Sequence, residues 1–141
     1  DATVLTMALA GFLATQMVLT GFEPYGKMRA GKAMVSRITA ELGPDTKIYS
    51  VGTYEQSLTF YLRRTVILVD YWDEFTFGLR QQPELSIPTF DGFVVQWNEQ
   101  TQRGVKAVAI MDNEDYAKFK ASGLPMRVIA EDTRRVVVAN I

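Results

Sequence analysis

Three carboxylates follow an apolar run in the middle of the chain, and they are the side chains best placed to do chemistry. Residues 65–70 read TVILVD, a run typical of a buried strand, and Asp73 and Glu74 come shortly after Asp70. Open α/β sheets place ligands at the carboxyl ends of their strands. Carboxylates there could bind a divalent cation or act as general acid and base. Acidic residues after a strand also simply cap the next helix, so both interpretations stay open.

Other polar and small residues are expected at the same edge of the sheet. A strand predicted over residues 47–52 ends at Gly52, which Thr53 and Tyr54 follow, and a strand predicted over residues 105–111 is followed by Asp112. If these strands are parallel, their carboxyl ends share one edge. The candidate ligand-binding residues are therefore Gly52, Thr53, Tyr54, Asp70, Asp73 and Asp112, suited to a nucleotide or a metabolite.

A glycine-rich segment comes close to a phosphate-binding loop but lacks its last residue. Residues 26–33 read GKMRAGKA, and the final position is Ala33, where the motif needs a Ser or Thr hydroxyl to bind Mg²⁺. The strand that should precede the loop is replaced by an uncharged, helix-like run. We interpret the segment as a basic connection rather than as a nucleotide site.

Composition excludes several kinds of site. The 141 residues include no Cys and no His, which rules out thiol chemistry and removes the commonest general base and metal ligand. Lys and Arg number 15 against 16 Asp and Glu, so no excess of positive charge favours nucleic-acid binding. We expect no metal, no cofactor and no nucleic-acid partner.

The first part of the chain carries the clearest signal. Residues 2–22 contain no charged side chain and are long enough, as a helix, to cross a bilayer. A buried core helix and a secretory signal are the alternatives, but core helices rarely run this long without a charge, and no basic start precedes the run. We expect its apolar surface to remain uncovered by the rest of the chain. Small residues at helical spacing would let another membrane helix approach closely: Ala8, Gly11, Ala14 and Thr15.

Strand and helix patterns alternate along residues 23–141. Helices are expected over residues 30–42, 56–64, 73–82, 89–102 and 113–121, and further strands over residues 65–70, 126–130 and 134–140. Thr89 should cap the fourth of these helices, and Pro83 and Pro88 indicate a loop before it. This order predicts an α/β, three-layer sandwich with a mostly parallel sheet. The last two strands should form a C-terminal antiparallel hairpin.

Basic residues follow the apolar run closely. Lys27, Arg29 and Lys32, which we call the basic collar, could contact membrane lipid phosphates. Basic residues beside membrane helices tend to lie on the cytoplasmic side. This rule depends on all the loops of a membrane protein and does not by itself fix the orientation of one helix. A plain solvated helix start explains the collar equally well.

An ordered set of segments resembles a known family. Residues 49–66 (YSVGTYEQSLTFYLRRTV), 70–75 (DYWDEF), 123–128 (GLPMRV) and 135–140 (RVVVAN) together resemble the C-terminal domain of bacterial aminoarabinose-transferase-like glycosyltransferases. These proteins are similar to protein O-mannosyltransferases. The resemblance implies an inner-membrane enzyme with many spans that uses undecaprenyl-phosphate sugars, with lipid A as the best-known acceptor. It also implies a last membrane span that leads into a periplasmic α/β domain.

The resemblance implies no catalytic residue in this chain, because the family's catalytic carboxylates lie upstream in the membrane portion. Residues 1–22 would then be the last transmembrane helix, or a remnant of it, and residues 23–141 a soluble accessory domain. The expected partners are membrane lipid, the upstream transmembrane part, and a lipid-linked sugar or lipid A. The alternatives are a membrane-anchored α/β ligand-binding module and a small soluble α/β enzyme.

Overall fold

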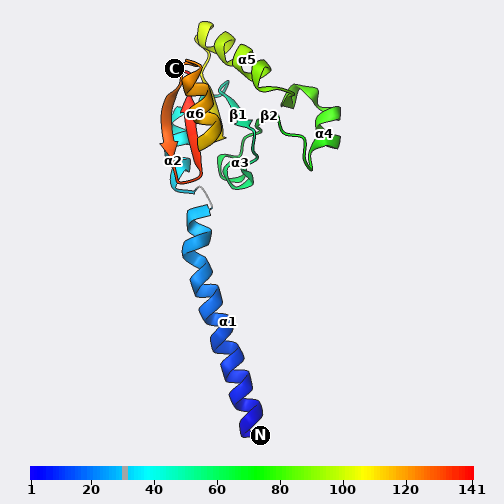
Figure 1. Ribbon diagram of the computed structural model, residues 1–141, viewed down its shortest axis with the longest axis vertical. Coiled ribbons are helices and arrows are strands. Elements are labelled where there is room, and N and C mark those ends of the chain that lie inside the picture. Colours follow the sequence, from blue (N-terminus) through cyan, green and yellow to red (C-terminus); the bar gives the residue numbers. More distant parts are fainter. Residues whose placement is uncertain (30–31) are drawn as a thin grey trace.

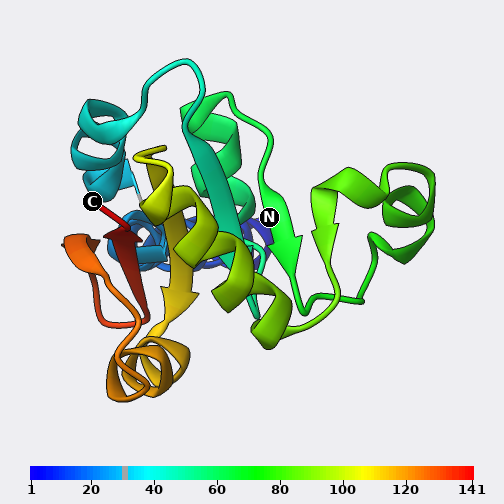
Figure 2. The same cartoon turned by 90° about the horizontal axis from the view of Figure 1, so that it is seen from above.

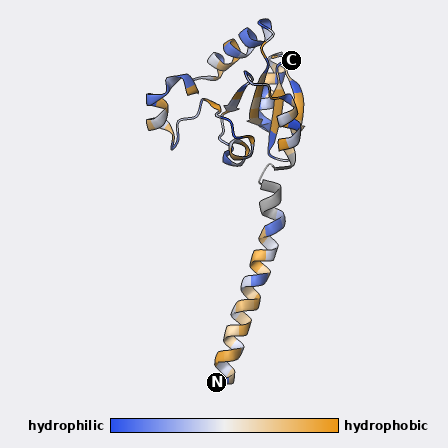
Figure 3. Cartoon of the chain, turned by 180° about the vertical axis from the view of Figure 1, so that it is seen from behind, coloured by the Kyte–Doolittle hydropathy of each residue, from blue (hydrophilic) through white to orange (hydrophobic). Residues whose placement is uncertain are grey.

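The computed structural model describes residues 1–29 and 32–141, and the side chains of residues 25–33 lie outside that description. The N-terminal helix α1 (Ala2–Arg29) projects away from the rest of the molecule (Figure 1). Its stretch Ala2–Pro24 includes an 18-residue window with a mean hydropathy of 1.7 that is 0% buried, so the helix is long and apolar enough to cross a membrane. Figure 3 shows this helix as a mostly hydrophobic rod below a domain of mixed hydropathy.

The exposure of α1 confirms the expectation that the domain does not cover it. Leu5, Leu9, Phe12 and Leu19 each expose more than half of their surface. The helix also runs further than residue 22, through Pro24 to Arg29. The sequence pattern missed this extension because it followed the uncharged run and stopped at the first acidic residue, Glu23.

The rest of the chain alternates strands and helices as expected. The helices are α2 (Lys32–Glu41), α3 (Gln56–Leu62), α4 (Thr76–Gln81), α5 (Phe90–Gln102) and α6 (Asn113–Ala121), with a short 3-10 turn η1 (Pro83–Leu85). The strands are β1 (Lys47–Val51), β2 (Ile67–Val69), β3 (Ser86–Ile87), β4 (Ala107–Asp112), β5 (Arg127–Glu131) and β6 (Arg135–Ala139). Thr89 caps α5 by accepting a hydrogen bond from the Gly92 amide at 3.1 Å, as predicted.

The strands of the described chain form one sheet in the order β3-β2-β1-β4-β6-β5. The first four are parallel, β6 is antiparallel to β4, and β5 is antiparallel to β6. The predicted α/β class, mostly parallel sheet and C-terminal antiparallel pair are thereby confirmed. The pairing of β5 with β6 shifts register between Val128 and Ala130, which leaves Ile129 as an extra residue on the edge strand.

The prediction of a loop between Pro83 and Pro88 was wrong in one respect, because residues 86–87 form β3. Val69 pairs with Ile87 in this two-residue strand. Pro88 has no backbone N–H to continue the ladder, so the strand stops there and reads from sequence as a loop.

Side chains alternate between two cores on either side of the sheet. On β1, Tyr49 packs with Phe93 and Trp97 of α5. Ile48 points to the other face, where it belongs to a core cluster with Ile38 of α2 and apolar side chains of α3. Figure 2 shows α3 and α5 on opposite faces of the sheet, which gives the expected three layers. Burial raises the pKa of the Tyr49 hydroxyl to about 12, and the nearby Glu99 carboxylate adds to the effect.

Helix α2 runs antiparallel to the parallel strands. Its last residue, Glu41, accepts hydrogen bonds at 3.0 Å from Lys106, which precedes β4, and at 3.0 and 3.1 Å from Arg127, the first residue of β5. The end of α2 therefore lies at the amino ends of these strands. Ten residues span about 15 Å, which carries the start of α2 back toward the carboxyl ends. The chain thus passes from α1 into the domain on the side of the sheet's carboxyl edge.

We expect Glu41→Gln to destabilise the domain by about 1 to 2 kcal/mol at neutral pH. The effect is no larger because both cationic partners are partly exposed and solvent weakens their attraction to the carboxylate. Hydrogen bonds from Arg127 and then Lys106 lower the pKa of Glu41 from 4.5 to about 2. The carboxylate therefore stabilises the fold above its unfolded pKa, and the contribution disappears as the pH falls from about 4.5 toward 2. Urea unfolding of both proteins across this range measures the difference. A constant difference at every pH would contradict the ion-pair explanation.

Candidate functional site

The turn after β1 brings Gly52 against helix α6. Gly52 has a φ of +64°, and a Cβ atom added there would lie 2.6 Å from Oδ2 of Asp115. Asp115 is buried, and its other carboxylate oxygen accepts a hydrogen bond from Lys118 at 3.1 Å. The Thr53 carbonyl accepts a hydrogen bond from the Ser50 hydroxyl at 2.6 Å. Gly52 and Thr53 thus form a tight turn at the junction of β1 and β4, which is the switch point of the strand order.

The predicted carboxylates lie at the same edge but do not gather into one cluster. Asp112 caps α6, and its Oδ1 accepts a hydrogen bond from the Asp115 amide at 2.8 Å. Asp70 has a φ of +49°, and its amide donates to the Ile87 carbonyl at 2.9 Å. Asp73 is exposed, and its backbone carbonyl accepts from Thr76. Within the described residues no group of three or more acidic side chains could hold a metal ion.

A buried ionic cluster lies beside this turn, and sequence patterns gave no sign of it. Arg135 is only 1% exposed and pairs with Glu55 and, at 2.8 Å, with Asp132. Arg134 also reaches Glu55, at 2.8 Å. Burial raises the pKa of Asp132, but the hydrogen bond from Arg135 and the amides of the turn outweigh it, so the net shift is downward. The cluster joins the start of α3 to the turn between β5 and β6.

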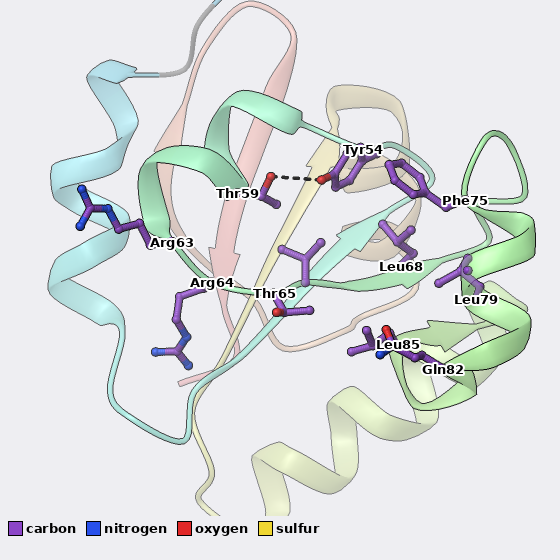
Figure 4. A pocket seen from close by; sticks show the side chains of 12 residues that line it. Tyr54, Thr59, Arg63, Arg64, Thr65, Leu68, Phe75, Leu79, Gln82 and Leu85 are labelled. Atoms are coloured by element: carbon purple, nitrogen blue, oxygen red, sulfur yellow. Dashed lines mark hydrogen bonds between the residues drawn. The ribbon is translucent and has the colours of Figure 1, made fainter.

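Tyr54 is the predicted site residue that lines a groove. The groove has a volume of about 460 Å³ and lies between α3 and α4, above β2. Its apolar lining includes Leu68, Leu79 and Leu85, and Figure 4 shows Tyr54 and Phe75 closing one end. The Tyr54 hydroxyl lies 3.2 Å from the Thr59 hydroxyl.

The lining of this groove suits an apolar ligand better than a charged one. Of its two arginines, Arg64 donates to the carbonyls of residues 43, 44 and 46, and Figure 4 shows Arg63 and Arg64 directed away from the middle of the groove. An apolar cleft of this size with a few hydroxyl groups is the usual form of a small-molecule site.

An aromatic cluster continues the groove toward the carboxyl edge. The rings of Tyr54 and Phe75 meet edge to face at 4.7 Å between centroids, and Tyr71 lies 6.4 Å from Tyr54. Burial and then the charges of Asp73 and Glu74 raise the pKa of Tyr71 above its usual value. A second, open hollow, lined by Gln56, Phe60 and Tyr61 among others, shares Tyr54, Thr59 and Phe75 with the groove.

Of the predicted residues, Gly52, Thr53 and Asp112 lie around the β1–β4 junction, Tyr54 lies in the groove, and Asp70 and Asp73 lie on the exposed loop after β2. Sequence reasoning missed Phe75, Leu79 and Leu85, which line the groove. In the sequence these residues show only the spacing of apolar residues along a helix, and residues of an ordinary hydrophobic core show the same spacing. The basic collar has its backbone in the last turns of α1 (Lys27, Arg29) and at the start of α2 (Lys32). Its side chains, and Ala30 and Gly31 of the P-loop-like segment, lie outside the described part of the chain.

Comparison with known proteins identifies relatives. The family model described as the aminoarabinose transferase C-terminal domain matches residues 34–140. Two crystal structures of ArnT from Cupriavidus metallidurans, one in the apo state and one bound to undecaprenyl phosphate, match 95% of this chain. For each, the sequence identity is 34% and the TM-score is 0.81, and the match covers 24% of the ArnT chain. This chain therefore spans about a quarter of the length of those structures. Among curated proteins, none matches the sequence.

Proposed function

The chain belongs to the aminoarabinose transferase C-terminal domain family, and from that membership we propose that it is the accessory, non-catalytic part of a larger membrane glycosyltransferase. The whole protein would move a sugar from a polyprenyl-phosphate donor to lipid A or a similar acceptor. The match to ArnT bound to undecaprenyl phosphate supports a lipid-linked donor. In this proposal α1 is the last membrane span, and the soluble domain faces the periplasm of a bacterial cell.

The position of the sheet's carboxyl edge is the observation that carries the proposal. Helix α2 starts at this edge, so the edge lies nearest the point where α1 leaves the membrane. The aromatic end of the groove and the switch point of the sheet open on the same side. In this proposal the soluble domain covers the active-site cavity of the membrane portion, and the arrangement of the carboxyl edge supports that placement.

An activity assay tests the assignment of the chemistry. The chain is incubated with an undecaprenyl-phosphate-linked aminoarabinose donor and lipid A, and the products are measured by mass spectrometry. We expect no transfer, because the proposed catalytic carboxylates and the lipid cavity belong to the rest of the protein. Transfer that disappears in Asp70→Asn would place the catalytic site in this chain. Addition of the full-length relative to the same mixture is the positive control.

Binding of the basic collar to lipid phosphates is a separate prediction. A fragment of residues 23–141 should bind anionic vesicles at low salt and bind weakly at physiological salt. Each basic residue near an anionic surface contributes about 1 kcal/mol, which falls off within a Debye length. Changing Lys27, Arg29 and Lys32 together to Gln should abolish most of the binding in a vesicle sedimentation assay.

The matched control changes Lys118 and Lys120 of α6 to Gln. Equal binding of the collar variant and the parent would show that the collar is a solvated helix start.

The groove between α3 and α4 favours a second candidate function. A stand-alone, membrane-anchored ligand-binding module would use its apolar lining of about 460 Å³ for a small apolar molecule. Titration of the fragment with a small apolar molecule that carries no isoprenoid phosphate, followed by the chemical shifts of Tyr54 and Leu68, tests the second proposal. Saturable binding that Leu79→Asp abolishes would favour the module.

A further inference from the structure

The exposed aromatic side chains of the soluble domain come from one short stretch. In the described part of the domain, the large hydrophobic residues that are exposed and aromatic are Phe60, Tyr61, Trp72 and Phe77, which we call the aromatic surface. Their exposed fractions are 77%, 39%, 53% and 78%. The other exposed large hydrophobics beyond α1 are the aliphatic Val95, Val128 and Ile141. Phe60 and Tyr61 lie next to each other, with ring centroids 5.4 Å apart, and large apolar side chains exposed together can mark a surface that meets a partner.

This surface lies on the side of the domain that α1 enters. Trp72 follows β2 at the carboxyl edge of the sheet, and Phe60 and Tyr61 lie in the second half of α3, the helix that begins at that edge. The Trp72 carbonyl accepts the Thr76 hydroxyl at 2.5 Å, which ties the loop to the first turn of α4, where Phe77 lies. Figure 1 shows α1 joining the domain beside α2 and α3, with α5 on the far side.

The length of α1 sets the distance of this side from the membrane. Residues 2–24 form about 35 Å of helix, enough for a hydrocarbon core of about 30 Å. The five further residues to Arg29 add about 7 Å, which is roughly the thickness of one headgroup layer. Since α2 starts three residues later at the carboxyl edge, that edge reaches the level of the headgroups.

Charge and residue type favour a lipid interface that is not strongly anionic. Residues 60–80 contain three arginines and three carboxylates, so the stretch has no net charge. Trp and Tyr concentrate at membrane–water interfaces because their rings are apolar on one side and can donate hydrogen bonds on the other. We propose that the aromatic surface lies in the headgroup layer of the bilayer that α1 spans, and that it holds the domain against the membrane. The proposal rests on α1 being a membrane span, but not on any transferase activity.

The two tryptophans of the chain provide a test without added labels. Trp97 is 0% exposed and donates to the Pro125 carbonyl at 2.8 Å, whereas Trp72 is half exposed. The whole chain is reconstituted in phosphatidylcholine vesicles in which bromine is attached either near the headgroup or near the bilayer centre. Bromine near the headgroup should quench the emission of Trp72 strongly, and bromine near the centre should quench it less. Trp72→Phe, which leaves Trp97 alone, should lose this response.

Two further measurements separate the proposal from its alternatives. Phe60→Ser combined with Phe77→Ser should reduce the quenching of Trp72, whereas Val95→Ser on α5 should not change it. The quenching should persist at high salt, unlike binding through the basic collar. Resistance of the chain to alkaline extraction reports that α1 has inserted. If α1 is inserted and Trp72 stays open to an aqueous quencher and insensitive to brominated lipid, the proposal is overturned. The surface would then be left for contact with the rest of a larger protein, and the proposed function would stand.

Discussion

Arg135→Ala should lower the free energy of unfolding of the domain by about 3 to 5 kcal/mol, the usual cost of breaking a buried ion pair by removing one partner. The guanidinium is 1% exposed and pairs with both Glu55 and Asp132. Among the ion pairs of the described residues, its loss leaves Asp132 without a cation and Glu55 with only the more exposed Arg134. Since a domain of this size is stable by only about 5 to 15 kcal/mol, this loss is a large part of the total, and the variant should unfold at a clearly lower urea concentration than the parent.

The neighbouring arginine is the matched control for this prediction. Arg134 pairs with the same Glu55 but is 39% exposed, so Arg134→Ala should cost less than about 1 kcal/mol. Urea unfolding of residues 23–141 measures both variants. The lowered pKa of Asp132 means that its carboxylate stabilises the fold above its unfolded pKa and stops doing so as the pH falls. The gap between parent and Arg135→Ala should therefore narrow in acid. Equal costs for the two arginines would mean that the cluster behaves as a surface ion pair.

Gly52→Ala should lower the free energy of unfolding of the domain by about 2 to 3 kcal/mol. Part of the loss comes from the left-handed backbone conformation at this position and part from a steric clash of the new methyl group. The φ of +64° is unfavourable for alanine, and the new methyl group would lie 2.6 Å from the buried carboxylate of Asp115. Gly104 has the same φ of +64°, but a Cβ added there would meet nothing within 4 Å. Gly104→Ala should therefore cost only the backbone part, about 1 kcal/mol.

The difference between the two glycine variants isolates the contact with Asp115. Thermal unfolding of both fragments under identical conditions gives it directly. Asp115→Ala combined with Gly52→Ala should recover part of the loss, because the oxygen that the methyl group meets is then gone. If the two glycine variants are equally destabilised, the turn after β1 tolerates a side chain, and α6 packs against it more loosely than the 2.6 Å approach implies.

The general architecture could be predicted from sequence because it follows from local signals. Thr89 caps α5, and the continuous apolar run at residues 107–111 forms a strand buried on both faces. The uncharged N-terminal run likewise needed no tertiary information. The edge strand β3 was missed because two residues between a 3-10 turn and a proline carry no periodicity.

The site could be predicted only in outline. The rule that ligands bind at the carboxyl ends of parallel strands located the right edge of the sheet. It could not show that the side chains of Asp70 and Asp73 stay exposed, or that the side chain of Tyr54 lines a groove. The ionic cluster joins Glu55 to residues about 80 positions later, and only the folded chain brings them together. Arg135 was especially hard to anticipate, because β6 is buried along its whole length and the three residues that follow Arg135 are valines.

The extra residue on β5 has a consequence for how the domain behaves at high concentration. Strands β3 and β5 are the two edges of the sheet, and an open edge can pair with the edge of a second copy. Ile129 interrupts the hydrogen-bonding repeat of β5, while Arg127 and Glu131 place charges at its two ends. β3 offers only two residues before Pro88. Both edges are therefore poor templates for strand addition, and the domain freed from α1 should resist edge-to-edge aggregation.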